Sequence, residues 1–119
     1  MINIGKHQIG LESKPFIIAE MSGNHNQSLD RAIAIVEAAA DAGAHALKIQ
    51  TYTPDTMTLD LKEGDFHISD PDSLWTGRSL YDLYGEASTP WEWHKPIFDR
   101  ANELGMIGLS TPFDDSAVD

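Results

Sequence analysis

The chain has 119 residues, a formal net charge of −11 and no cysteine. Its length suits one domain with a core of its own, and the lack of cysteine excludes disulfides, thiolate metal ligands and a cysteine nucleophile. The acidic balance argues against nucleic-acid binding, because no basic stripe is present to contact phosphates. No apolar run approaches the ~20 residues of a membrane span, which argues against a membrane partner. The N-terminal residues lack the layout of a signal peptide, so a cytoplasmic location is expected.

The first half of the chain alternates patterns typical of strands with a pattern typical of a helix. Residues 1–10 predict a short N-terminal hairpin, and the apolar run Phe16–Glu20 predicts a buried strand. Ser28 is a good N-cap for a helix whose apolar residues recur at three- and four-residue steps as far as a glycine stop at Gly43. A second strand is then expected over Leu47–Tyr52.

The second half begins with a polar segment, residues 53–77, that is longer than an ordinary connection and therefore indicates a functional or mobile element. A second helix is expected to start in a capping box over Thr89–Glu92, and Pro96 should kink that helix or delay its start. A third strand follows over Met106–Thr111, and Ser116 is the expected N-cap of one more helix.

This order of strands and helices predicts parallel strands joined by right-handed crossovers. Doubly wound sheets and barrels are both built in this way. The glycine-rich motif that binds a dinucleotide phosphate after the first strand is missing, which argues against a dinucleotide-binding fold. The residues alone therefore predict an α/β protein of one of these two architectures.

Polar side chains recur where the predicted strands end. Glu20 ends the first strand, Lys48 and Gln50 lie in the second, and Ser110 and Thr111 end the third. Ligands bind at the carboxyl ends of parallel strands, so these five residues are candidates for binding a small anionic, oxygen-rich substrate. Other interpretations remain open: a structural ion pair for Glu20 and Lys48, strand-end caps for Ser110 and Thr111, and a solvated Gln50.

The five histidines of the chain show none of the spacings of a metal site, and the acidic residues of the 53–77 segment lack the ligand order of an EF-hand. We therefore expect no metal site built from this chain alone.

Several motifs together resemble the N-terminal part of the sialic acid synthase family. They are Ile18-Ala19-Glu20, the turn Gly23-Asn24-His25, Asp41-Ala42-Gly43-Ala44, Lys48-Ile49-Gln50-Thr51 and the ending "LSTPFDDSAVD". The segment "SLWTGRSLYDLYGEASTPWEWHKPIFDRANELG" most resembles the pseudaminic acid synthase branch of that family.

The resemblance implies the N-terminal part, about three βα units, of a TIM (β/α)8 barrel. It also implies condensation of phosphoenolpyruvate with an N-acetylated amino sugar, of the 2,4-diacetamido-2,4,6-trideoxy-altrose type, to give pseudaminic acid and phosphate. An N-acetylneuraminate or legionaminic acid synthase, a spore-coat polysaccharide homologue and a non-catalytic binding or assembly module are the alternatives. Family members carry a C-terminal antifreeze-like domain and work as domain-swapped homodimers.

The resemblance also implies roles for single residues. Lys48 would hold phosphoenolpyruvate, Thr111 would help to bind its anionic groups, Glu20 would lie beside the reacting carbons and Gln50 would face the sugar. The turn residues Asn24 and His25 are further candidates for substrate binding.

A divalent cation, Mn²⁺ or Mg²⁺, is implied as well, held by histidines from a later part of the barrel. Family members are much longer than this chain. We therefore expect a protein of only these residues to be inactive and poorly stable.

Overall fold

Three parallel strands form the centre of the chain. The structure is a computed structural model that describes residues 1–119. Strands β3 (Ile18–Glu20), β4 (Ala46–Thr51) and β5 (Ile107–Pro112) make a sheet in the order β3-β4-β5. Both pairs of neighbours are parallel, which confirms the α/β class and the parallel strands predicted from the sequence.

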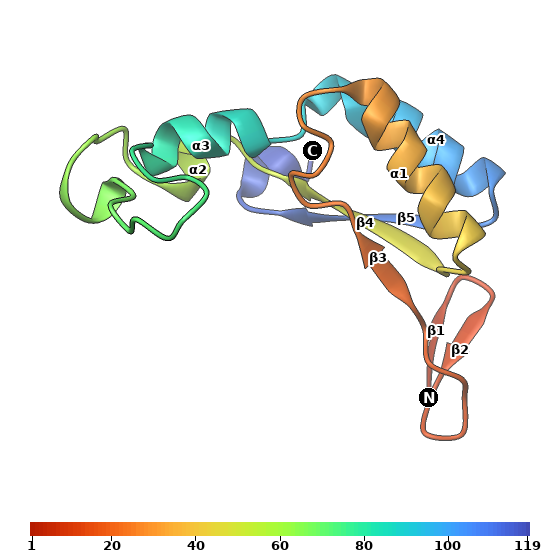
Figure 1. Ribbon diagram of the computed structural model, residues 1–119. Helices are drawn as coiled ribbons and strands as arrows, with labels where there is room; N and C mark the ends of the chain where they lie inside the picture. Colours follow the sequence, from red (N-terminus) through yellow and green to blue (C-terminus); the bar gives the residue numbers. More distant parts are fainter.

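Two helices cover one face of this sheet. Helix α1 (Leu29–Asp41) connects β3 to β4, and helix α4 (His94–Glu103) precedes β5 and packs against α1 (Figure 1). The start of α1 is the predicted one, because the Ser28 hydroxyl accepts a hydrogen bond from the Arg31 backbone N–H at 3.2 Å. This contact satisfies one of the free N–H groups of the first turn.

The core lies between the sheet and these two helices. Leu47 and Ile49 of β4 are fully buried against Val36 of α1 and Ile97 of α4. Gly108 of β5 also faces α4, and its lack of a side chain is required there because a Cβ atom would overlap the Phe98 ring. The odd-numbered residues of β4 and the even-numbered Gly108 therefore point to the helices.

The start of α4 differs from the prediction. No capping box forms; a 3₁₀ turn, η2 (Trp91–Trp93), comes first and the α-helix begins at His94. The Thr89 hydroxyl is hydrogen-bonded to the buried His25 ring instead of to the helix backbone. The delayed start is confirmed, and it places Pro96 in the first turn, where a missing N–H costs no helical hydrogen bond.

The expected helix cap at Ser116 is also wrong. Residues Asp115–Ala117 form only a 3₁₀ turn, η3, whose N-cap is Asp114. The Ser116 hydroxyl donates to the Asp114 carboxylate at 2.9 Å, so it takes part in the turn and caps no helix.

The segment between β4 and η2 extends beyond the carboxyl ends of the strands (Figure 1). It contains helix α2 (Pro54–Met57), the 3₁₀ turn η1 (Gly64–Phe66) and helix α3 (Leu80–Ala87). The Tyr81 hydroxyl donates to the Asp55 carboxylate at 3.1 Å and so connects α3 to α2. Helix α3 was not predicted from the sequence.

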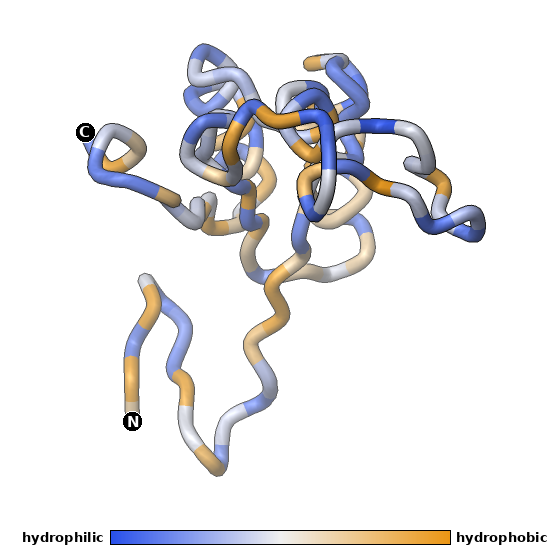
Figure 2. Tube along the Cα trace, turned by 90° about the vertical axis from the view of Figure 1, so that its left-hand side faces the viewer, coloured by the Kyte–Doolittle hydropathy of each residue, from blue (hydrophilic) through white to orange (hydrophobic).

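At the other end of the sheet, strands β1 (Ile2–Ile4) and β2 (His7–Ile9) form the predicted antiparallel hairpin. The hairpin projects away from the remainder of the chain (Figure 2). The radius of gyration is 16.6 Å, against about 13.5 Å for a compact chain of this length.

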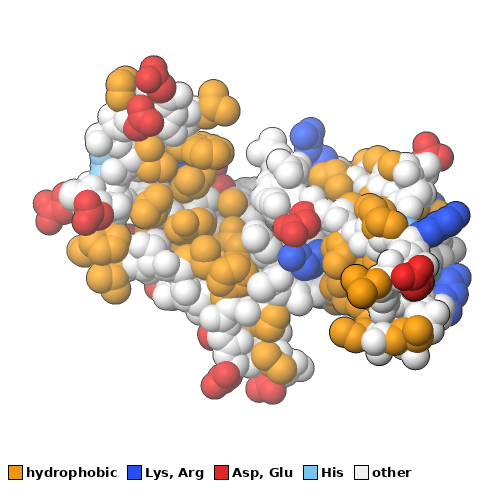
Figure 3. Space-filling model, turned by 90° about the horizontal axis from the view of Figure 1, so that it is seen from below, with side chains coloured by type: hydrophobic (Ala, Val, Ile, Leu, Met, Phe, Trp, Pro, Cys, Tyr) orange, Lys and Arg blue, Asp and Glu red, His pale blue; other side chains and the backbone are white.

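The sheet face away from α1 and α4 is open. Hydrophobic side chains gather over the side of the molecule seen from below (Figure 3), and Ile18 of β3 is among the exposed large apolar residues. The buried hydrophobic cluster joins β4 to α1 and α4, so the core lies on the helix side of the sheet. No helix of the structure has the length and apolar character needed to cross a bilayer.

Candidate functional site at the carboxyl ends of the strands

Four of the predicted site residues lie on the open face of the sheet. In the register of the strands, Glu20 is opposite Lys48, and Gln50 is opposite Thr111. Side chains alternate between the two faces of a strand. Since Leu47 and Ile49 point to the helices, Lys48 and Gln50 point away from them, together with their register partners. We call these four residues the rim residues.

Glu20 and Lys48 form an ion pair across β3 and β4. The Lys48 Nζ lies 2.9 Å from the Glu20 Oε1, and the side chains are 30% exposed at Lys48 and 52% exposed at Glu20. The structural ion pair considered from the sequence is therefore present. At such exposure an ion pair contributes only about 0–1 kcal/mol, and the ammonium group keeps further N–H donors for an anion.

Ser110 is separated from the rim residues. Its hydroxyl lies 2.5 Å from the Thr51 hydroxyl and 3.3 Å from the Ile49 carbonyl oxygen, on the helix side of the sheet. Adjacent residues of a strand face opposite ways, so Ser110 and Thr111 cannot both reach one ligand. The expectation that Ser110 joins the binding site is thus corrected; its interactions are structural.

Thr51 continues this buried network to helix α4. Its hydroxyl lies 2.5 Å from the Nε2 of His94, whose Nδ1 lies 3.0 Å from the Trp91 carbonyl oxygen. A carbonyl only accepts, so Nδ1 carries the proton and Nε2 accepts from the Thr51 hydroxyl. The network connects β4 and β5 to the start of α4.

His25 is fully buried and has no access to a ligand. Its Nδ1 accepts the Gln27 backbone N–H at 3.1 Å, so the neutral ring donates from Nε2 to the Thr89 hydroxyl at 3.1 Å. The ring also meets Trp93 edge-on, with 5.2 Å between centroids. Burial lowers the pKa of His25, which favours this neutral form. His25 therefore does not bind substrate, although the sequence led us to expect that it would; it positions the turn in which it lies.

His25 belongs to a turn, residues 22–27, which follows β3 and lies beside the rim residues. Three of its residues, Ser22, Asn26 and Gln27, have positive φ angles of 52°, 47° and 59°, a conformation that costs free energy for residues other than glycine. A Cβ atom at Gly23 would come within 3.0 Å of Ala87 in α3, so the turn and that helix are in close contact. The turn therefore contacts two later parts of the chain, Thr89 and helix α3.

A cleft of about 690 Å³ lies between this turn and α3. Its lining combines residues of the turn, of β4 and of the segment that follows: Ser22, Gly23, Asn24, Asn26, Arg31, Gln50, Tyr52, Trp75, Arg78, Leu83, Tyr84, Glu86 and Ala87. Asn24 remains a candidate because it lines this cleft, with its Nδ2 donating to the Met21 carbonyl at 2.9 Å. The cleft volume is within the range of small-molecule sites.

Neither helix α3 nor the cleft residues Arg78 and Glu86 were predicted from the sequence. Ser79 accepts the Asp82 backbone N–H at 3.2 Å as the N-cap of α3. A serine followed by apolar residues at 80, 83, 84 and 87 is a signal for a short helix. Arg78 carries no such signal, because only the folded segment brings it beside Gln50 and Tyr52 of the cleft.

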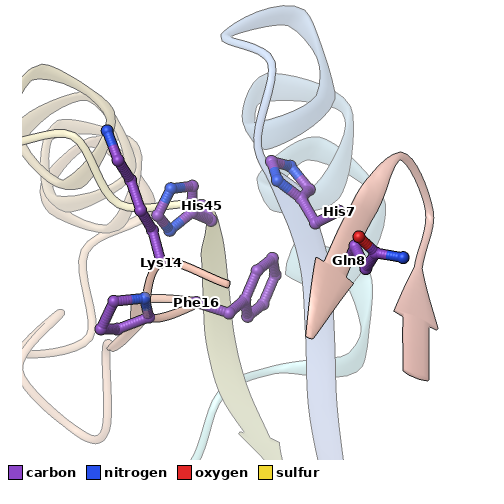
Figure 4. A pocket seen from close by; sticks show the side chains of 6 residues that line it. His7, Gln8, Lys14, Phe16 and His45 are labelled. Carbon is purple, nitrogen blue, oxygen red and sulfur yellow. The ribbon is translucent and has the colours of Figure 1, made fainter. Parts of the chain in front are cut away.

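A second, smaller cavity of about 240 Å³ lies at the amino ends of the strands (Figure 4). His7 of the hairpin and His45 flank Phe16, with ring centroids 5.2 to 5.3 Å apart. The His45 Nδ1 accepts the Ile17 backbone N–H at 2.8 Å. These contacts pack the hairpin against the start of the sheet and are structural.

The chain does not supply a metal site on its own. No group of three or more histidine, aspartate or glutamate side chains is placed to hold a metal ion. The family resemblance implies that histidines from a later part of the barrel would hold the divalent cation, and residues 1–119 contain no such group.

The fold and the rim residues show the class of protein: an α/β protein with a candidate ligand site at the carboxyl ends of parallel strands. The family follows from the comparisons. The NeuB family model matches residues 35–119, and the chain belongs to the NeuB family. This confirms the resemblance to sialic acid synthases seen in the sequence.

Individual relatives agree with this family. The chain is 50% identical over 102 residues to a pseudaminic acid synthase of Campylobacter jejuni, covering 86% of this chain and 29% of that protein. It is 45% identical over 105 residues to the Helicobacter pylori pseudaminic acid synthase, covering 88% and 30%. The chain thus spans less than a third of the length of these relatives.

Solved structures support the same fold. The N-acetylneuraminic acid synthetase of Leptospira borgpetersenii superposes with a TM-score of 0.78 at 26% identity, covering 98% of this chain and 35% of that one. The Bacillus subtilis spore coat protein SpsE superposes with a TM-score of 0.66 at 34% identity, covering 98% and 28%.

Proposed function

We propose that the chain is part of an enzyme that condenses phosphoenolpyruvate with an N-acetylated amino sugar of the 2,4-diacetamido-2,4,6-trideoxy-altrose type, giving pseudaminic acid and phosphate. The observation that carries the proposal is the group of rim residues on one open sheet face, in a chain 50% identical to pseudaminic acid synthases. The lower identity of 33% to a legionaminic acid synthase favours pseudaminic acid as the product.

The rim residues have complementary roles in this proposal. Lys48 donates to the carboxylate or phosphate of phosphoenolpyruvate, and Thr111 donates a hydroxyl to the same anion. Gln50 lies two residues further along β4 and binds sugar hydroxyl groups. Glu20 is held beside Lys48 by the 2.9 Å ion pair and lies next to the reacting carbons.

The reaction balances without a redox partner. C3 of phosphoenolpyruvate forms a bond to the aldehyde carbon of the open-chain sugar, water supplies the oxygen that C2 gains, and phosphate leaves. Holding the two substrates side by side at the rim accounts for much of the rate gain in such a reaction.

Three further parts belong to the proposal. The three strands are the first part of a TIM barrel, whose carboxyl-end face carries the site. A divalent cation, Mn²⁺ or Mg²⁺, takes part with ligands that residues 1–119 do not supply. The active form is a homodimer.

The test is an assay of the whole enzyme that contains this chain, with phosphoenolpyruvate, Mn²⁺ and 2,4-diacetamido-2,4,6-trideoxy-altrose, and with N-acetylmannosamine as the competing sugar. The proposal expects phosphate release that depends on the first sugar and a product with the mass of pseudaminic acid. Preference for N-acetylmannosamine would assign an N-acetylneuraminate synthase instead. Phosphate release without any sugar would contradict the condensation.

A further inference from the structure

The cleft beside the rim residues contains groups that the proposed reaction has not yet used. Gln50 and Tyr52 lie on its β4 side, while Trp75, Arg78 and Glu86 come from α3 and the loop before it. Gln50 belongs both to the rim and to the cleft, so the cleft begins where the rim residues end. A ligand that reacts at the rim can therefore extend into it.

Arg78 and Glu86 form a two-point ion pair in this cleft. The Arg78 Nη1 donates to the Glu86 Oε2 at 2.7 Å, and Nη2 donates to Oε1 at 2.5 Å. The pair uses two of the five guanidinium N–H groups and leaves lone pairs on both carboxylate oxygens. Hydrogen bonding to Glu86 raises the pKa of Arg78, and hydrogen bonding to Arg78 lowers the pKa of Glu86, so both stay charged at neutral pH.

The backbone around Arg78 is also fixed. Its N–H donates to the Trp75 carbonyl at 3.1 Å, and its carbonyl accepts from the Ile68 N–H at 2.9 Å. The residue Trp75 is nevertheless 51% exposed. An indole with half its surface open beside fixed polar groups is suited to stacking on a ligand.

The chemistry of these groups matches an acetamido group. An acetamido substituent presents an N–H donor and a carbonyl acceptor next to each other. The Arg78–Glu86 pair presents a donor and an acceptor next to each other, and Trp75 offers an apolar face for a methyl group or a sugar ring.

We propose that the cleft is the sugar subsite of the enzyme, and that Arg78, Glu86 and Trp75 select the sugar by binding one of its acetamido groups. This inference rests on the proposed function for its substrate. It goes beyond the rim residues, because it assigns recognition of the sugar to α3 and the loop before it.

The test measures binding of 2,4-diacetamido-2,4,6-trideoxy-altrose to the protein by saturation-transfer NMR, without phosphoenolpyruvate. The variants are Trp75→Ala and Arg78→Met. The matched control is Arg100→Met, since Arg100 also pairs with a glutamate, Glu37, at 2.9 Å but lies on α4 away from the cleft. We expect each cleft variant to weaken sugar binding about tenfold and the control to leave it unchanged.

Circular dichroism checks that the variants fold, and Trp75→Ala is the safer of the two because its indole is half exposed. Sugar binding that is absent in the wild type, or equal in wild type and both cleft variants, would overturn the inference. Binding that the variants weaken, with no product formed in the full assay, would support the subsite and count against the synthase reaction. Product formation with an unchanged KM for the sugar in both variants would support the synthase reaction and count against the subsite.

Discussion

Replacing Lys48 by methionine separates a binding role from a structural one. The change keeps the aliphatic stem and removes the charge that lies 2.9 Å from Glu20. Because both side chains are partly exposed, loss of the ion pair should lower the free energy of unfolding by no more than about 1 kcal/mol. A hydrogen bond to a charged group contributes about 1.5–3 kcal/mol, so phosphoenolpyruvate binding should weaken on the order of 10- to 100-fold.

Two measurements check this prediction: a urea titration for stability and calorimetry for phosphoenolpyruvate binding. Lys95→Met is the matched control, because Lys95 forms an ion pair with Asp99 at 2.6 Å on the surface of α4. The control should leave phosphoenolpyruvate binding unchanged. Wild-type binding in Lys48→Met, or a large loss of stability with no loss of binding, would show that Lys48 serves only the fold.

Three further predictions concern the fold around the site. Leu47→Ala should lower the free energy of unfolding by about 2–5 kcal/mol in a urea titration, since Leu47 is fully buried between the sheet and the helices; a change below this range would place the core elsewhere. Gly108→Ala should also destabilise the chain, because its Cβ would overlap the Phe98 ring, and an equal midpoint in urea would refute that contact. Burial lowers the pKa of His25 below 6.5 in the folded chain, so the unfolded chain binds more protons below that pH. Stability should therefore fall as the pH drops below about 6.5, and His25→Asn should reduce this dependence in urea titrations at several pH values.

The elements that local rules describe were predictable. Helix α1 combines a serine cap at Ser28 with an apolar stripe that needs no distant partner to be recognised. The strands are short apolar runs, and the alternation in β4 already separates Lys48 and Gln50 from Leu47 and Ile49.

The same alternation explains why Ser110 lies apart from the rim residues. The sequence analysis predicts Ser110 and Thr111 as one group because both end the third strand, although neighbours in a strand face opposite ways. Ser110 therefore joins Thr51 on the helix side. Applying the two-residue period to β5 as strictly as to β4 would have removed Ser110 from the candidate site.

Contacts between distant residues account for the remaining differences. Thr89 does not cap a helix because its hydroxyl bonds to His25, which is 64 residues earlier in the chain. His25 is predicted as a substrate-binding residue because nothing in its local sequence shows that the folded chain buries it. Trp75 and Arg78 reach the cleft only because α3 packs beside the turn at Gly23.

The measurement that tests the central claim most directly is a coupled one: phosphate release and product mass from the same reaction with phosphoenolpyruvate, a divalent cation and 2,4-diacetamido-2,4,6-trideoxy-altrose. We expect one phosphate released for each molecule of pseudaminic acid formed, with both rates lowered in Lys48→Met when phosphoenolpyruvate is not saturating. Phosphate and product that persist unchanged in Lys48→Met would contradict the assigned site. If the whole enzyme that contains this chain binds neither substrate and forms no product, the proposed reaction is contradicted.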